Sequence, residues 1–90
     1  MDILDISTLG NFLRFKRTMS GMSQQEVTSK AVESLPNVRG FQRAALAHWE
    51  MDNRIPNHSQ ARAISDALSL SPLETNQLVE LIIEAETKKP

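Results

Sequence analysis

The sequence lacks cysteine and tyrosine altogether, holds only three glycines, and has no long uninterrupted apolar run. Without cysteine there is no disulfide and no thiolate metal site, so packing, helix capping and association must stabilise the fold. Without an apolar stretch of about 20 residues there is no candidate membrane-spanning helix, and the acidic start after Met1 lacks the pattern of a signal peptide. We therefore expect a cytoplasmic protein with no membrane partner.

Catalytic patterns are also missing. There is no glycine-rich phosphate loop, no Ser-His-Asp spacing, and no pair of carboxylates that can be assigned to a pocket. His48 and His58 have no carboxylate or cysteine at ligand spacing, so we expect no metal and no cofactor. The sequence argues against an enzyme.

The net charge of −1, taken alone, argues against nucleic-acid binding, because a phosphate-binding surface is normally basic. The distribution of charge points the other way. Between Gly10 and Ile64 there are eight basic and four acidic residues, a local charge of +4, whereas residues 65–87 carry five acids and no base. The chain therefore combines a basic body with an acidic C-terminal segment, and the sum hides a local field.

The sequence does contain helical periodicity, and 90 residues suffice for one core only. We predict a single all-α domain over residues 1–90 with about five helices. Gly21 ends the first helix, where a left-handed cap costs least. The expected helix starts lie after Ser7 or Thr8, at the capping boxes Ser23 with Glu26, Asn57 with Gln60 and Ser71 with Glu74, and near Phe41.

The third of these helices spans about residues 41–51, after a loop from Ser34 to Gly40. Phe41, Leu46 and Trp49 recur on one side and are expected to anchor the helix in the core. The other side is therefore expected to face solvent.

The last helix, about residues 72–87, is apolar around more than one face. One helix in so small a protein cannot bury every apolar side chain, so some are expected to meet a second copy. The expected dimer interface consists of Leu78, Val79, Ile82 and Ile83.

The order of these signals resembles the XRE type of helix-turn-helix domain, the family of lambdoid phage repressors and Cro proteins. The resemblance implies a compact five-helix, lambda-repressor-like DNA-binding domain, with an enlarged turn between the second and third helices. It covers roughly Leu9 to Leu78, most of the chain. It rests on Leu13, Arg14 and Arg17, on residues 21–27, on Trp49 and Glu50, on Arg54, Ile55 and Pro56, and on residues 63–71.

In this family the third helix enters the major groove of double-stranded DNA, so the resemblance assigns base contacts to its exposed side. Arg43 suits a bidentate pair with guanine, whereas an alanine can at most touch a thymine methyl. His48 either reaches a guanine or a phosphate, or is a half-buried helix residue beside Trp49. The expected base contacts are Gln42, Arg43, Ala44, Ala47 and His48.

The resemblance also implies contacts to the DNA backbone. Gln24 matches a phosphate-clamping glutamine at the first turn of the second helix, where the helix N-terminus also favours an anion. Asn53 and Arg54 match positions of further phosphate contacts, and Arg39 in the enlarged loop is a weaker candidate.

Arg17 and Glu50 match a family pair that forms a buried ion bridge between the first and third helices, and we assign them to structure. Two features depart from the family. The loop is longer by about eight residues than a usual tight turn, and it either lifts the third helix or carries Arg39 to a neighbouring phosphate. Asp52 stands where the family usually has glycine; aspartate tolerates left-handed geometry, but an acid there faces the DNA side unfavourably.

The resulting expectation is a homodimeric transcriptional regulator that binds an inverted-repeat operator, most simply as a repressor. Its length suits a Cro-like phage or prophage regulator or the antitoxin of a toxin–antitoxin pair. The alternative is an interaction module that has lost the DNA face and docks a partner protein, such as a toxin or a polymerase subunit, through its last helix. The acidic balance and the two alanines on the exposed side favour this alternative.

Overall fold

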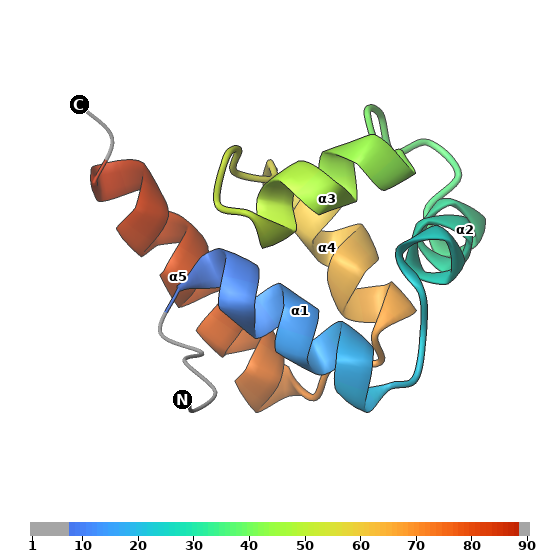
Figure 1. Ribbon diagram of the computed structural model, residues 1–90, viewed down its shortest axis with the longest axis horizontal. Helices are drawn as coiled ribbons and strands as arrows, with labels where there is room; N and C mark the ends of the chain where they lie inside the picture. The colour runs from blue at the N-terminus through green and yellow to red at the C-terminus, as the bar shows by residue number, and fades with distance from the viewer. Residues whose placement is uncertain (1–7, 89–90) are drawn as a thin grey trace.

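The structure is a computed structural model that describes residues 8–88. These residues form helices and no strand (Figure 1), so the all-α prediction is confirmed. The third helix begins two residues later and ends one residue earlier than predicted. The helices are α1 (Leu9–Met19), α2 (Gln24–Ser34), α3 (Arg43–Glu50), α4 (His58–Ala67) and α5 (Pro72–Thr87).

Local side-chain caps explain where the helices begin. At α1, the Thr8 hydroxyl accepts a hydrogen bond from the backbone N–H of Asn11. At α2, α4 and α5 a cap side chain accepts from the third helical residue, whose own side chain accepts from the cap N–H. All three predicted capping boxes are therefore confirmed. They pair Ser23 with Glu26, Asn57 with Gln60, and Ser71 with Glu74.

Three helices end in the same way, on a residue of positive φ just after the C-cap. These residues are Gly21 after α1, Asp52 after α3 and Ser69 after α4, with φ of 71°, 60° and 53°. In each case the next residue donates its N–H to the carbonyl five positions earlier, which is the Schellman arrangement. Glycine adopts this geometry freely, whereas a residue with a Cβ does so at a cost of about 1–2 kcal/mol.

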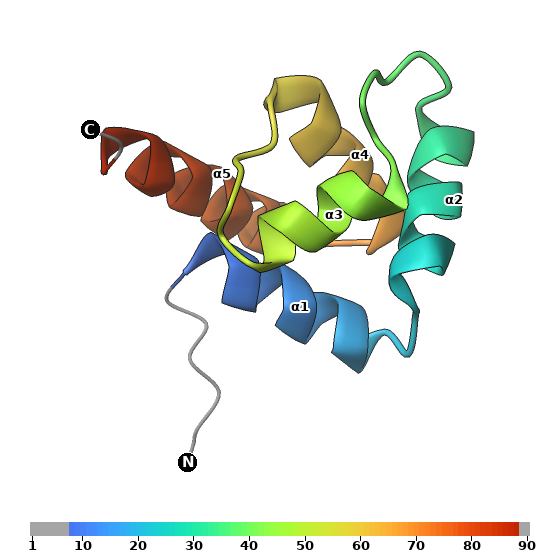
Figure 2. The ribbon, with the colours of Figure 1, turned by 45° about the horizontal axis from the view of Figure 1, so that its top comes forward.

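Helix α4 lies in the middle of the molecule (Figures 1 and 2). It packs against α2 and α5, while α1 packs against α3 and α5, and α2 also contacts α3. Every helix sends at least one fully buried side chain into one shared core, as expected of a single domain. These side chains are Phe12, Leu13, Val27, Leu46, Ile64 and Leu78.

Helix α3 is anchored by the residues that the sequence analysis identified. Leu46 and Trp49 are each 2% exposed, and Phe41, just before the helix, is 5% exposed. The rings of Phe41 and Trp49 meet edge to face with centroids 5.1 Å apart, an arrangement that aromatic quadrupoles favour. One side of α3 is therefore committed to the core, and the opposite side is free to face outward.

The last turns of α5 project away from the other helices (Figures 1 and 2). Val79 and Ile83 are 41% and 53% exposed and lie one turn apart, and Ile82 is half-buried. The prediction for Leu78 is wrong, because this side chain is fully buried within its own chain and cannot meet a second copy. Among residues 8–88, no helix has the length and apolar character needed to cross a membrane.

Candidate nucleic-acid interface

The outward side of α3 forms the centre of the candidate interface. Gln42, Arg43 and Ala44 are exposed at the start of the helix, and Ala47 is half-buried one turn later. Gln42 is the N-cap, yet its side chain makes no capping hydrogen bond. The first-turn N–H groups of α3 therefore lack the side-chain partner that the other four helices have.

His48 is only partly accessible on this side of the helix. It is half-buried, and its Nδ1 atom is enclosed without a hydrogen-bond partner among residues 8–88. Its backbone carbonyl accepts the N–H of Asn53 at 2.9 Å, which closes the end of α3. Nδ1 is therefore closed to a ligand, whereas Nε2 remains for a contact at the surface, and both interpretations of His48 stay predictions.

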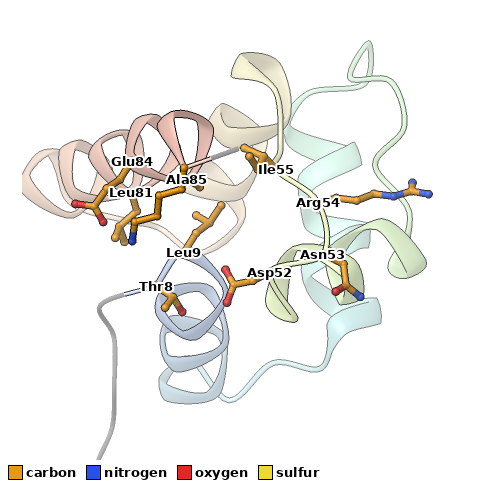
Figure 3. A pocket seen from close by; sticks show the side chains of 10 residues that line it. Thr8, Leu9, Asp52, Asn53, Arg54, Ile55, Leu81, Glu84 and Ala85 are labelled. Atoms are coloured by element: carbon orange, nitrogen blue, oxygen red, sulfur yellow. The ribbon is translucent and has the colours of Figure 1, made fainter. Parts of the chain in front are cut away.

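Arginines occur before, within and after α3 in the chain. Arg39 precedes α3, Arg43 is its first residue, and Arg54 follows it; all three are exposed, and none pairs with a carboxylate of residues 8–88. Asn53 is exposed beside Arg54. Figure 3 shows the Arg54 side chain extending away from α5. Within residues 8–88, three guanidinium groups without a paired carboxylate therefore stand along residues 39–54, which favours a locally positive surface.

A polar network fixes the base of α3 against α1 and α2. The Glu50 carboxylate is 3% exposed and accepts hydrogen bonds from Arg17 Nε at 2.6 Å and Arg17 Nη2 at 3.0 Å. Arg17 Nη1 donates to the Met22 carbonyl at 3.0 Å. The carboxylate raises the pKa of Arg17, chiefly through these hydrogen bonds, although burial opposes the shift. The structure thus contains the ion pair that the sequence analysis assigned to Arg17 and Glu50.

Gln24 belongs to the same network. Its side-chain amide donates at 3.0 Å to Glu50 Oε1, the oxygen that also accepts from Arg17 Nη2, and the side chain is half-buried. One N–H and the amide oxygen remain for a contact at the surface. The bond to Glu50 was not foreseen, because the two residues are 26 positions apart and no local pattern links them. Gln24 is held in place by a residue of α3.

The Asp52 carboxylate points towards the start of α1. It accepts the backbone N–H of Gly10 at 2.8 Å, at the start of α1. A carboxylate there is stabilised by the partial positive charge of a helix N-terminus. The close approach requires glycine, because a Cβ on residue 10 would lie 2.5 Å from the Glu50 carbonyl oxygen. The acid therefore joins α1 to the end of α3.

Lys16 forms an ion pair that joins α1 to α5. Its ammonium pairs with the Glu74 carboxylate on α5 and lies 5.6 Å from the ring centroid of Phe12. The hydrogen bond from Lys16, followed by that from the Ser71 backbone, lowers the pKa of Glu74 to about 2. This contact between α1 and α5 is structural.

A pocket of about 460 Å³ lies between the start of α1, the loop after α3 and the end of α5 (Figure 3). Leu9, Ile55 and Leu81 line it, together with charged groups at its edge. The Asp52 carboxylate is already bound to Gly10, and Arg54 extends away, so these charges do not converge on one point. Residues 8–88 contain no cluster of three or more His, Asp or Glu side chains that could hold a metal ion.

No known protein family, no curated protein and no solved structure matches this chain.

Proposed function

We propose that this chain is a sequence-specific, double-stranded-DNA-binding transcriptional regulator of the XRE helix-turn-helix type. In this proposal α2 and α3 form the helix-turn-helix unit with an enlarged turn, and a dimer represses from an inverted-repeat operator. The observation that carries it is the two-sidedness of α3. Phe41, Leu46 and Trp49 hold one side in the core, while Arg43 and Ala44 stand exposed on the other.

The Glu50 network supports the same proposal. A helix that reads base edges must be held at a fixed angle, since misplaced side chains lose their hydrogen bonds. Glu50 ties α3 to α1 through Arg17 and to α2 through Gln24. The helix proposed to read the operator and the helix start proposed to clamp a phosphate are therefore joined by one buried carboxylate.

Selection of bound duplexes from a random library tests the proposal. We expect a half-site repeated with two-fold symmetry, at a spacing near one helical turn, about 10 base pairs. Two phosphate-contacting arginines per subunit, Arg39 and Arg54, give a slope of log K against log salt of about −3.6 for the dimer. This is a loss of roughly 100-fold between 50 and 200 mM salt. Absence of both enrichment and salt dependence would refute the proposal.

Two arginine variants separate base contacts from phosphate contacts. Arg43→Ala is expected to weaken operator binding by about 1–3 kcal/mol and to relax the base preference at one position of the half-site. Arg54→Ala, the matched control, is expected to weaken all sequences alike and to flatten the salt dependence. If the selected sequence is unchanged in Arg43→Ala, Arg43 does not contact bases.

The dimer is proposed to form through the exposed face of α5. Val79 and Ile83 are exposed one turn apart on this helix, and the half-buried Ile82 flanks them. Ile83→Glu is expected to split the dimer in sedimentation experiments, because it places a charge in an apolar contact. Gln77→Glu adds the same charge at another exposed position of α5 and should leave the dimer intact. An intact Ile83→Glu dimer would move the interface elsewhere.

The same exposed face supports a second candidate, an interaction module that docks a partner protein such as a toxin or a polymerase subunit. Val79 and Ile83 stand among the acids of α5, a surface suited to a partner with apolar and basic side chains. Titration of salt against binding to random duplex DNA discriminates the two. A flat profile would favour this module over the regulator.

A further inference from the structure

The loop between α2 and α3, residues 35–42, is attached to the body at several points. Leu35 and Val38 are half-buried against the core, and the Val38 N–H donates to the Leu35 carbonyl at 2.9 Å. Phe41 then enters the core beside Trp49. An enlarged loop that packs three apolar side chains against the core loses little conformational freedom on binding a ligand, because the freedom is already lost on folding.

Gln60 adds a polar clasp to this loop. Its Oε1 accepts the Asn57 N–H at 2.8 Å in the capping box of α4, and its Nε2 donates to the Arg39 carbonyl at 2.9 Å. One amide therefore caps α4 and holds the backbone of Arg39. The Arg39 side chain is exposed, so the clasp fixes the point from which this guanidinium departs without occupying it.

Gly40 makes the clasp possible. Its φ is +70°, a conformation that residues with a Cβ rarely adopt. A Cβ on residue 40 would also lie 3.0 Å from Gln60 Nε2, so that a side chain there presses on the amide. The backbone of Gly40 and the amide of Gln60 thus depend on each other.

We propose that Gln60 is a positioning residue: it holds the α2–α3 loop as a second DNA-contacting element and aims Arg39 at a backbone phosphate next to the half-site under α3. The inference rests on the proposed function. The enlarged loop had two alternatives, to lift α3 or to carry Arg39 to a neighbouring phosphate, and this inference favours the phosphate contact. Nothing in the local sequence links Gln60 to Arg39, which lie 21 positions apart.

The clasp is tested first without DNA, by the rate at which trypsin cuts the Arg39–Gly40 bond. Gln60→Glu keeps an acceptor for the Asn57 N–H, as glutamate does in an ordinary capping box, and removes the donor to Arg39. We expect cleavage to accelerate about three- to tenfold, the equivalent of one net hydrogen bond. Ser59→Glu adds the same charge one residue earlier and should leave the rate unchanged. Gly40→Ala, an uncharged second variant, should accelerate cleavage in the same way.

The positioning role is tested next on the selected operator with Arg39→Ala, Gln60→Glu and the double variant. Arg39→Ala should reduce the salt slope of a dimer by about two, since each subunit loses one phosphate contact. Gln60→Glu should lower affinity about three- to tenfold beyond Ser59→Glu, but change it less than about twofold once Arg39 is alanine. If Gln60 had only a structural role, Gln60→Glu would lower the thermal stability of the chain and leave the salt slope of DNA binding unchanged.

The outcomes separate the two proposals. Unchanged tryptic cleavage in Gln60→Glu and Gly40→Ala would overturn the clasp, whatever the chain binds. Accelerated cleavage together with an equal loss of affinity in the presence and absence of Arg39 would overturn the positioning role only. If the unaltered chain selects no duplex at any salt concentration, the proposed function fails, and the positioning role fails with it.

Discussion

The buried carboxylate of Glu50 offers the sharpest test of how this fold is held together. It is 3% exposed and accepts three hydrogen bonds, two from Arg17 and one from Gln24. Glu50→Ala removes the acceptor and leaves the Arg17 guanidinium, which is 19% exposed, without its counter-charge. The Gln24 amide loses a partner at the same time.

The expected loss of stability is large for so small a domain. Breaking one side of a buried ion pair costs about 3–5 kcal/mol. The lower value applies here, because Arg17 keeps its bond to the Met22 carbonyl and reaches some water. About 3 kcal/mol corresponds to a fall in Tm of roughly 12–24 °C at this chain length. Such a loss is a substantial part of the total stability that a domain usually has, about 5–15 kcal/mol.

Trp49, the single tryptophan, is buried beside Glu50 in α3 and reports unfolding by fluorescence in a urea titration. The matched cycle uses Arg17→Met, Glu50→Met and the double variant. We expect the double variant to lose about 2 kcal/mol less than the two single losses added together, because no unpaired charge remains buried. A loss below about 1 kcal/mol for Glu50→Ala, or simple additivity in the cycle, would refute the reasoning.

Three further predictions concern the helix ends and one surface pair. Gly10→Ala should cost about 1–3 kcal/mol in urea titrations despite the better helix propensity of alanine, because its Cβ would overlap the Glu50 carbonyl. Ser69→Gly should raise the unfolding free energy by about 0.5–1 kcal/mol, because serine holds a positive φ there. Glu74 has its pKa lowered from 4.5 to about 2, so its contribution is present above pH 4.5 and lost as the pH falls towards 2. Stability curves of Glu74→Gln should therefore be flatter over that range, and equal slopes would contradict the assignment.

The helix starts could be predicted because their causes are local. A serine or asparagine and the glutamate or glutamine three residues later bond each other wherever the rest of the chain lies. All three capping boxes follow this rule. The predicted start of α3 is two residues too early because no such local cause exists there: Gln42 makes no side-chain cap.

The inward face of α5 could not be predicted in the same way. The apolar residues of this helix spread around it, and periodicity alone does not say which side meets the core. They are Leu73, Leu78, Val79, Leu81, Ile82 and Ile83. The packing of α5 against α1 and α4 decides it, by burying Leu78 and leaving Val79 and Ile83 in solvent. One of the four residues expected at the dimer interface, Leu78, is therefore buried in the core of its own chain.

By itself, the sequence determined the helical class, the capping-box starts of α2, α4 and α5, and the anchoring side of α3, since capping and apolar periodicity act over one or two turns. Only the tertiary structure decided the contacts between distant segments, such as Gly10 with Asp52, Gln24 with Glu50, and Arg39 with Gln60. Each depends on how distant segments approach each other, and a single hydrogen bond leaves no periodic trace in the sequence.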